Sequence, residues 1–396
     1  MYLTKEEEKI LNGEEGYAAK KSMEILVALG NIYGAEKLID VKSVQVAGVS
    51  YYNLGDAGLE FLSDLAKDGK VKVFTTLNPA GMDLVNWMEH KIPEDFAQKQ
   101  NLVVDSFRKM GITISCTCIP YLADNLPKFG EHIAWSESSA VTFANSIIGA
   151  RTNKEGGPSA LAAAITGKTP FYGLHLDENR RPNIQVEIKT HIKNISDWGA
   201  LGYCIGKETE NMIPYITGIK KASVDELKSF SASVVTYGSK PLFHIKGITP
   251  EAKNYDIPKE KVVIEADDIK KAYSEINDDV NEVDFVWIGC PHCSIEEIAY
   301  IARLLKDKRI SSDVEFWITT ARKIKELADK KGYTKIIENA GGKFVCDTCV
   351  AVAPLKGRFK SVMTNSAKGG YYSRANNEMK IKFRSLEDCI NVVVEK

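Results

Sequence analysis

The chain has 396 residues, of which 44% are hydrophobic and 27% are charged, and its 52 basic and 53 acidic residues leave a formal net charge of −1. This balance is typical of soluble globular proteins, and it excludes the strongly basic surface expected of a protein that binds nucleic acid or a membrane surface. The N-terminal MYLTKEEEKILNGEEG lacks a signal-peptide pattern, and no apolar run reaches the roughly 20 residues of a membrane span, so we expect a cytoplasmic protein.

The N-terminal half is predicted to alternate strands and helices, because short β-branched runs are followed by segments with helical spacing of apolar residues. Residues 168–223 break this order, since they are rich in Gly, Pro and Asn, and we predict that they are irregular with short strands. The regular segments of this half are, in chain order, strand 43–50, helix 56–69, strand 71–81, helix 95–111, strand 112–117, helix 138–150 and helix 159–167.

The C-terminal half shows the same alternation more clearly. Helices of this length between strands imply right-handed crossovers and parallel sheets. We therefore predict an α/β fold of two or more lobes, with an N-terminal lobe at 1–220 that includes the irregular Gly-rich segment and a C-terminal lobe at 221–396. The segments are helix 224–238, strand 241–248, strand 261–266, helix 267–277, strand 283–289, helix 294–307, strand 314–321, helix 321–331, strand 343–348 and strand 361–365.

Six of the eight cysteines fall in three close pairs, each after a short apolar run. A cysteine at the end of a strand lies at the edge of an open α/β sheet where ligands bind, and three such edges can converge. In a cytoplasmic protein, paired cysteines favour metal or redox chemistry over structural disulfides, with hyperthermophile proteins as the exception. We therefore expect one thiolate per strand end to hold an iron–sulfur cluster. The pairs are Cys116/Cys118, Cys290/Cys293 and Cys346/Cys349.

Two other interpretations of the cysteines remain open at this point. A zinc site could use the two C-x-x-C pairs, but 52 residues separate Cys293 from Cys346, whereas zinc ribbons space such pairs by about 15–20 residues. Cysteines also serve as small buried hydrophobic residues, which is what we expect of Cys204 and Cys389.

Polar residues gather after several predicted strands, at positions that parallel sheets would place along a cleft between lobes. In TNSAKGGYY, the two glycines allow close approach of the backbone to an oxyanion, Ser366 offers a hydroxyl and Lys368 a charge. A surface turn is the alternative for this segment. The other such residues are Gly48, Val49, Ser50, Asn78 and Pro79.

Glu137 and Ser138 open a predicted helix in AWSESSAV. A helix cap and first-turn carboxylate would account for both residues. The functional alternative makes Glu137 a carboxylate that handles a proton or binds a substrate hydroxyl. Among the histidines, His292 is the one of interest for function, because it lies between Cys290 and Cys293.

Taken together, these motifs resemble the aconitase X family, and the resemblance extends over nearly the whole chain. It is closest to the archaeal two-subunit branch of that family. The motifs that carry it are CTCIPY, WSESSAVTFANSIIGARTNKEGG, GLHLDENR, IGCPHCSIEEI, CDTCVAVAP and TNSAKGGYY.

The resemblance implies an aconitase-like fold and a hydro-lyase that dehydrates (R)-5-phosphomevalonate to trans-anhydromevalonate 5-phosphate in a modified mevalonate route to isoprenoids. It also implies a 4Fe–4S cluster, or its 3Fe–4S form after isolation, held by three cysteines. The swivel domain of the superfamily, which carries a serine base, is expected on a separate small subunit, so the implied assembly is a heterodimer.

The resemblance implies a role for individual residues where a motif of the family matches this sequence. Cys118 precedes Ile-Pro-Tyr, Cys290 belongs to GCPH and Cys349 to DTC, so these three are the implied cluster ligands, with Cys116, Cys293 and Cys346 as bystanders. Glu137 and Ser138 are the implied catalytic residues. The implied substrate-binding positions are Gly48, Val49, Ser50, Asn78, Pro79, Glu137, Ser138, Ser366 and Lys368.

Three alternatives to this function are retained. One is a hydro-lyase like the cis-3-hydroxy-L-proline dehydratases, the single-chain branch of the same family. Another is a non-catalytic iron–sulfur or redox protein, which would ligate every iron with cysteine. The last is a zinc-stabilised scaffold subunit.

Overall fold

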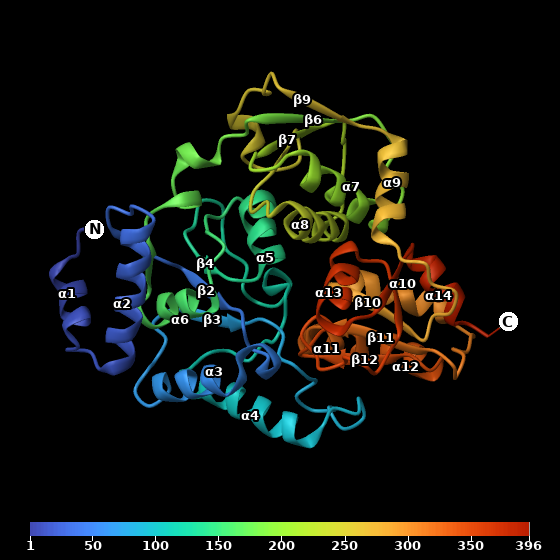
Figure 1. The fold of residues 1–396 in the computed structure, drawn as a ribbon, viewed down its shortest axis with the longest axis horizontal. Helices are drawn as coiled ribbons and strands as arrows, with labels where there is room; N and C mark the ends of the chain where they lie inside the picture. Colours follow the sequence, from blue (N-terminus) through green and yellow to red (C-terminus); the bar gives the residue numbers. More distant parts are fainter. Residues whose placement is uncertain (396) are drawn as a thin grey trace.

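Four β-sheets organise the chain, and three of them are wholly parallel (Figure 1). The structure is a computed structural model that describes residues 1–395. Helices cover the parallel sheets, so the predicted α/β fold with several lobes is confirmed. The lobes form three domains, which follow one another around the molecule in Figure 1.

The first domain is built on the sheet order β3-β2-β4, beside an antiparallel pair formed by β1 and β5. Its strands are β1 (Leu38–Asp40), β2 (Ser43–Val46), β3 (Phe74–Leu77), β4 (Ala134–Trp135) and β5 (Lys168–Pro170). Its helices are α1 (Lys5–Asn12), α2 (Tyr17–Ile32), α3 (Tyr51–Leu65), α4 (Glu94–Lys109), α5 (Ser138–Phe143), which continues as a π-helical turn (Ala144–Ile148), and α6 (Gly157–Thr166).

The middle domain has the strand order β8-β7-β6-β9. The predicted lobe boundary near residue 220 falls between β7 and β8, which belong to the same sheet. The boundary therefore cuts through one domain and does not separate two domains. The strands are β6 (Ile184–Ile188), β7 (Pro214–Thr217), β8 (His244–Ile245) and β9 (Lys261–Ile264). The helices are α7 (Ile195–Glu208), α8 (Val224–Gly238) and α9 (Ala266–Ile276).

The third domain has five parallel strands in the order β12-β11-β10-β13-β14. The chain leaves β10 toward one edge and then returns to its other side at β13, so the order reverses between β10 and β13. Ligands bind at such switch points, beyond the carboxyl ends of the strands. The strands are β10 (Phe285–Cys293), β11 (Glu315–Thr320), β12 (Lys343–Cys346), β13 (Ser361–Thr364) and β14 (Lys380–Phe383).

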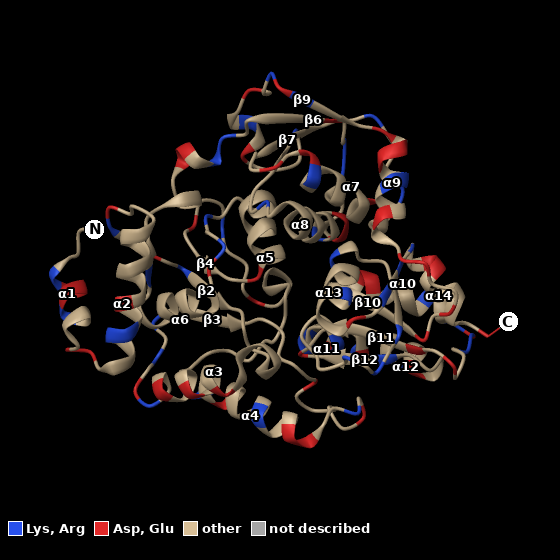
Figure 2. Cartoon of the chain, in the orientation of Figure 1, with Lys and Arg blue, Asp and Glu red and all other residues tan. Residues whose placement is uncertain are grey.

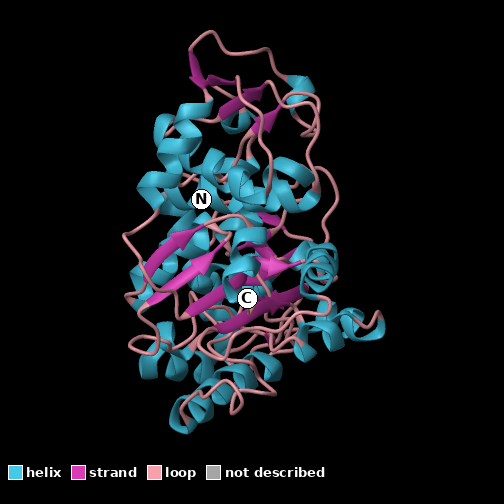
Figure 3. Cartoon of the chain, turned by 90° about the vertical axis from the view of Figure 1, so that its right-hand side faces the viewer, coloured by secondary structure: helices cyan, strands magenta, loops and turns pink. Residues whose placement is uncertain are grey.

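The helices of the third domain are α10 (Ile295–Leu305), α11 (Arg322–Lys330), α12 (Tyr333–Asn339), α13 (Ala367–Asn377) and α14 (Leu386–Val393). Single-turn helices occur at Pro120–Leu122, Gly173–His175, Asp177–Arg180 and Ala252–Asn254. Figure 3 shows the strands of the middle domain separated from the other sheets by a layer of helices.

Capping residues explain why two of the predicted helices begin where they do. Ser223 and Glu226 form a capping box at the start of α8, and Ser294 and Glu297 form one at the start of α10. In each case the serine hydroxyl accepts an N–H of the first turn and the glutamate accepts the N–H of the serine. These helices match their predicted bounds closely.

The predicted strand at 112–117 is wrong. Thr113 forms only an isolated bridge with Thr76, and the chain then turns at Cys116, whose φ is 40°. The left-handed backbone at Cys116 ends any extended run. Cys118 therefore lies on a loop and not at the end of a strand.

The prediction for 168–223 is also wrong in part, because this segment contains the helix α7. The glycines of α7 argue against a helix at the level of sequence, since glycine usually weakens a helix. Here they allow close contact with α8: a Cβ at Gly202 would lie 2.9 Å from the Phe230 carbonyl oxygen, and one at Gly206 would lie 2.8 Å from the Gly238 nitrogen.

One buried apolar cluster runs through the middle and third domains and includes the loop around Cys118, while a second fills the first domain. Figure 2 shows residues of both charge signs along outer helices such as α4 and α9. Within residues 1–395, none of the helices combines the length and the apolar character that a membrane crossing requires.

Candidate active site

A cavity of about 170 Å³ lies where β10, the start of α13 and loops of the first domain meet. It is at the switch point of the five-stranded sheet, as expected for an α/β ligand site. Eight of the predicted site residues line it: Asn78, Pro79, Cys118, Glu137, Ser138, Cys290, Cys349 and Lys368. The remaining lining residues are Asn53, Gly289, Pro291, Ala351, Val352, Tyr372 and Asn376.

The backbone of β10 bends just before its cysteines. The register with β11 shifts between Ile288 and Cys293, and Gly289 has a φ of 116°. A Cβ at Gly289 would lie 2.2 Å from the Thr319 carbonyl oxygen, so only glycine fits there. This irregularity places Cys290 in the cavity wall and Cys293 in the buried interior.

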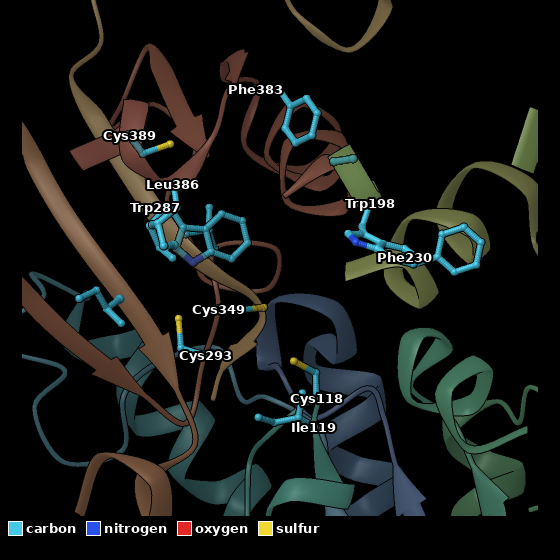
Figure 4. Packing of buried hydrophobic residues seen from close by; sticks show 14 of the residues in the cluster. Cys118, Ile119, Trp198, Phe230, Trp287, Cys293, Cys349, Phe383, Leu386 and Cys389 are labelled. Carbon is cyan, nitrogen blue, oxygen red and sulfur yellow. The ribbon is translucent and has the colours of Figure 1, made fainter. Parts of the chain in front are cut away.

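The cavity collects one cysteine from each pair. Figure 4 shows the side chains of Cys118 and Cys349 pointing toward the same region, with Cys293 apart from them. The other cysteine of each pair, namely Cys116, Cys293 and Cys346, is buried and does not line the cavity.

Polar groups near the cavity sulfurs oppose the effect of burial on these thiols. The His292 amide donates to the Cys118 Sγ at 3.2 Å. Burial raises the pKa of Cys290 to about 11, and a hydrogen bond from Ser366 opposes part of that rise. Burial likewise raises the pKa of Cys349, partly opposed by the Ala351 amide. Such donors stabilise thiolates and tune the potentials of clusters that thiolates hold.

The three cysteines fit a polynuclear centre better than a single metal ion. Cys290 and Cys349 line the cavity but Cys293 and Cys346 do not, so the two C-x-x-C pairs are split, which disfavours a zinc site formed by all four cysteines. Iron–sulfur clusters are held by cysteine thiolates. Two buried cysteines and one half-buried cysteine, Cys290, thus offer three soft donors on one cavity wall, which fits an iron–sulfur cluster.

Lys368 and Glu137 form an ion pair on the cavity wall, and both are largely buried. Burial alone would raise the pKa of Glu137, but the Lys368 charge and hydrogen bonds from Lys368 and Ser139 hold that pKa below its usual value. Burial alone would lower the pKa of Lys368, and Glu137 holds it above its usual value. Both side chains are therefore charged at neutral pH.

Hydrogen bonds fix the Glu137 carboxylate from two sides. Asn78 Nδ2 donates to Oε2 at 2.9 Å, and the Ser139 hydroxyl donates to Oε1 at 2.9 Å. Glu137 also caps α5 by accepting the Ser139 amide at 3.3 Å. Glu137 is therefore both a helix cap and a carboxylate of the cavity wall.

Four predicted site residues lie outside the cavity lining. Ser366 caps α13 by accepting the Gly369 amide at 2.9 Å. Ser50 caps α3 and donates to the Val352 carbonyl at 2.8 Å, and Val49 beside it is buried. Gly48 has a φ of 78° on an exposed turn.

Sequence reasoning found Lys368 but missed the other two residues that α13 contributes to the wall, Tyr372 and Asn376. Lys368, Tyr372 and Asn376 are spaced by four residues, which places them on one face of this helix. The segment TNSAKGGYY was interpreted as an anion site with a surface turn as the alternative, and no helix was predicted there, so the spacing was not used. The signal that could have found it was Ser366 acting as a helix cap, with small residues after it.

Comparisons with known proteins agree on one family. Sequence models described as the aconitase X first, second and third domains match residues 1–178, 182–274 and 283–395. The chain is 50% identical to the phosphomevalonate dehydratase large subunit of Methanocaldococcus jannaschii, over 98% of this chain and 99% of that one.

A solved structure and a second kind of relative extend this result. The crystal structure of Thermococcus kodakaraensis aconitase X in its holo-form matches with a TM-score of 0.93 and 49% identity, over 99% of this chain and all of that one. The cis-3-hydroxy-L-proline dehydratase of Pseudomonas aeruginosa is 33% identical over 98% of this chain but only 69% of its own length.

Proposed function

Because the chain belongs to the aconitase X family, we propose that it is the large, catalytic subunit of a phosphomevalonate dehydratase, a hydro-lyase. The observation that supports this most strongly is the match to an archaeal large subunit over 98% of this chain and 99% of that one. The cavity adds support, since it combines three soft sulfur donors with a fixed cation and a fixed carboxylate.

In the proposed reaction, (R)-5-phosphomevalonate loses its C3 hydroxyl and one C2 proton as water, and a double bond forms between C2 and C3. A 4Fe–4S cluster, with 3Fe–4S as its form after loss of one iron, would be held by Cys118, Cys290 and Cys349. When bound, this cluster supplies a Lewis acid for a substrate oxygen.

The other side chains of the wall position and bind the substrate. Lys368 supplies a positive charge that a carboxylate or phosphate of the substrate can approach. Glu137 is held as a carboxylate, so it accepts a hydrogen bond from a substrate hydroxyl, and Ser138 lies beside it. Asn78 and Pro79 complete this side, with Gly48, Val49, Ser50 and Ser366 on the surrounding turns.

A phosphate remote from the reacting carbons contributes binding energy that orients the reacting end. The general base that removes the C2 proton would come from a small subunit that carries the swivel domain, as the words "large subunit" in the relatives' names suggest. The assembly we propose is thus a cytoplasmic heterodimer whose second chain covers the cavity and excludes water.

The cis-3-hydroxy-L-proline dehydratases support a second candidate substrate. They belong to the same family, but they resemble this chain less, and the chain spans about two thirds of their length. A non-catalytic cluster carrier is disfavoured by the charged pair beside the sulfurs, because such a protein has no use for a cation and carboxylate in the cavity.

The test is a substrate comparison. The chain is purified without oxygen, reconstituted with iron and sulfide, combined with the small subunit and incubated in parallel with (R)-5-phosphomevalonate, mevalonate and cis-3-hydroxy-L-proline. We expect the phosphorylated acid alone to give an unsaturated product by mass spectrometry and proton NMR. Turnover of hydroxyproline with none of phosphomevalonate would replace the proposal with its alternative.

A further inference from the structure

His292 is completely buried, and it contacts all three of the segments that carry the cavity cysteines. Its Nδ1 lies 3.0 Å from the Thr117 hydroxyl, and its Nε2 lies 2.9 Å from the Thr348 carbonyl oxygen. Thr117 immediately precedes Cys118, and Thr348 immediately precedes Cys349. His292 itself is two residues after Cys290, on β10.

These contacts fix the tautomer of the ring. A carbonyl oxygen only accepts hydrogen bonds, so Nε2 carries the proton and donates a hydrogen bond to the Thr348 carbonyl. Nδ1 is then an acceptor, and the Thr117 hydroxyl donates to it. The same hydroxyl accepts the Ile119 amide at 3.3 Å, which is consistent with this direction. Both ring nitrogens are therefore satisfied by partners in two different loops.

The backbone of His292 is held equally firmly. Its N–H donates to the Cys118 Sγ at 3.2 Å, and its carbonyl accepts the Lys228 ammonium at 3.0 Å. Lys228 is itself buried and paired with Asp225 and Glu297. The residue thus ties β10 and the two loops to the core formed by α8 and α10.

Packing alone does not explain a histidine at this position, because burying an imidazole costs free energy unless both nitrogens are hydrogen-bonded. An aliphatic side chain would fill the space without that cost. We propose that His292 is a positioning residue that holds Cys118, Cys290 and Cys349 in the relative placement an iron–sulfur cluster requires. This inference rests on the proposed function, and it adds a residue that does not touch the cluster itself.

Three variants separate the contacts. His292→Gln can still donate to the Thr348 carbonyl but loses the hydrogen bond with the Thr117 hydroxyl. Thr117→Val removes that same hydrogen bond by deleting the hydroxyl. His292→Leu loses both ring contacts. The matched control is His244→Leu. His244 lies on β8 of the middle domain, is also fully buried, and contacts the Arg180 carbonyl oxygen with its Nε2 at 2.8 Å.

The measurement is the rate at which a chelator removes iron from the anaerobically reconstituted chain, followed by visible absorbance. Iron and sulfide content and the EPR spectrum of the cluster are recorded in parallel. Loss of a residue that orients metal ligands costs roughly 10- to 100-fold in metal affinity, so we expect His292→Leu to accelerate cluster loss by that order. His292→Gln and Thr117→Val are expected to show smaller and similar accelerations.

The double variant His292→Gln/Thr117→Val tests whether the hydrogen bond between the His292 ring and the Thr117 hydroxyl is what slows cluster loss. Both changes remove the hydrogen bond between Thr117 and His292, and Thr117→Val also removes the acceptor of the Ile119 amide. The double variant is therefore expected to lose its cluster no faster than Thr117→Val alone, and to share its altered EPR spectrum. Circular dichroism of the cluster-free variants checks that they fold. If His292→Leu does not fold, the two smaller variants and their combination still give the answer.

The experiment distinguishes a failure of the proposed function from a failure of this inference alone. A wild-type chain that takes up no cluster at all would overturn the proposed function and this inference with it. A wild-type chain that holds a cluster, together with folded His292 and Thr117 variants whose cluster loss and EPR spectra match those of wild type and His244→Leu, would overturn the inference and leave the proposed function standing.

Discussion

Lys368 and Glu137 lie 231 residues apart in the chain and form a buried ion pair in the wall of the cavity. Lys368 is on the first turn of α13 in the third domain, and Glu137 caps α5 in the first domain. The pair therefore joins two domains at the point where the cysteines converge. A buried pair of this kind is costly to break from one side, because the remaining charge is left without compensation.

Replacing Lys368 with Met removes the cation while keeping a side chain of similar length. We expect KM for phosphomevalonate to rise, since loss of a charge-assisted contact costs roughly 1.5–3 kcal/mol, or about one to two powers of ten. Steady-state kinetics of the two-subunit enzyme measure this effect. An unchanged KM and kcat/KM would dismiss a role for Lys368 in substrate binding.

The control for Lys368→Met is Glu251→Gln, which breaks a comparable buried pair with Arg180 in the middle domain, away from the cavity lining. Both variants are expected to lower the free energy of unfolding, by up to about 3–5 kcal/mol. Only Lys368→Met is expected to change KM, so the comparison separates lost stability from lost binding.

Serine substitutions of the six paired cysteines test the ligand assignment. We expect Cys118→Ser, Cys290→Ser and Cys349→Ser to lose iron, sulfide and visible absorbance after anaerobic reconstitution, because these three sulfurs share the cavity. Serine in place of the other member of each pair is expected to leave the cluster content near that of wild type. Full cluster content in Cys118→Ser would show that the assignment is wrong.

The cysteines also show how far sequence reasoning reached. The pairs at the carboxyl ends of β10 and β12 were recognised as strand-end positions because apolar β-branched or aromatic runs precede them, and Cys293 and Cys346 are the last residues of these two strands. Cys118 was assigned to the same kind of position, but it lies on a loop, since Cys116 adopts a left-handed backbone that no propensity indicates. The choice within each pair rested on resemblance alone.

The parts of the site that the sequence did not reveal depend on contacts between distant segments. The roles of Thr117 and Thr348 around His292, 175 and 56 residues away along the chain, follow from how three loops pack and leave no local pattern. Tyr372 and Asn376 could have been found from their spacing on α13, had the cap at Ser366 been recognised. The boundary near 220 was placed where composition changes, and β6 to β9 pair across that position.

Activity is expected to require a second chain. The cavity wall holds sulfurs, one ion pair and the hydroxyls of Ser138 and Tyr372, and none of the described lining residues is a histidine that could activate a hydroxyl as a base. We expect the reconstituted large subunit alone to hold a cluster and to dehydrate phosphomevalonate negligibly, with activity appearing in proportion to added small subunit up to a one-to-one ratio. Robust turnover by the large subunit alone would contradict this.

The Lys368–Glu137 pair also predicts a pH window for the stability of the cluster-free chain. The folded-state pKa of Glu137 lies below its usual value of 4.5, so its contribution is present above pH 4.5 and is lost as the pH falls through the folded-state pKa. The folded-state pKa of Lys368 lies above its usual value of 10.5, so its contribution is present below pH 10.5 and is lost only at higher pH.

Between these limits the pair is fully charged, and Glu137→Gln, which leaves the buried Lys368 without a counter-charge, is expected to lower Tm by a constant amount. Below pH 4.5 the wild-type carboxyl takes up a proton and comes to resemble the glutamine amide, so the difference in Tm between wild type and Glu137→Gln is expected to narrow. Thermal unfolding followed by circular dichroism from about pH 3 to 9 measures this difference, with Glu251→Gln recorded alongside. A gap that widens as the pH falls would mean that Glu137 is protonated in the folded chain at neutral pH, and the charged pair would then have to be abandoned as a feature of the cavity.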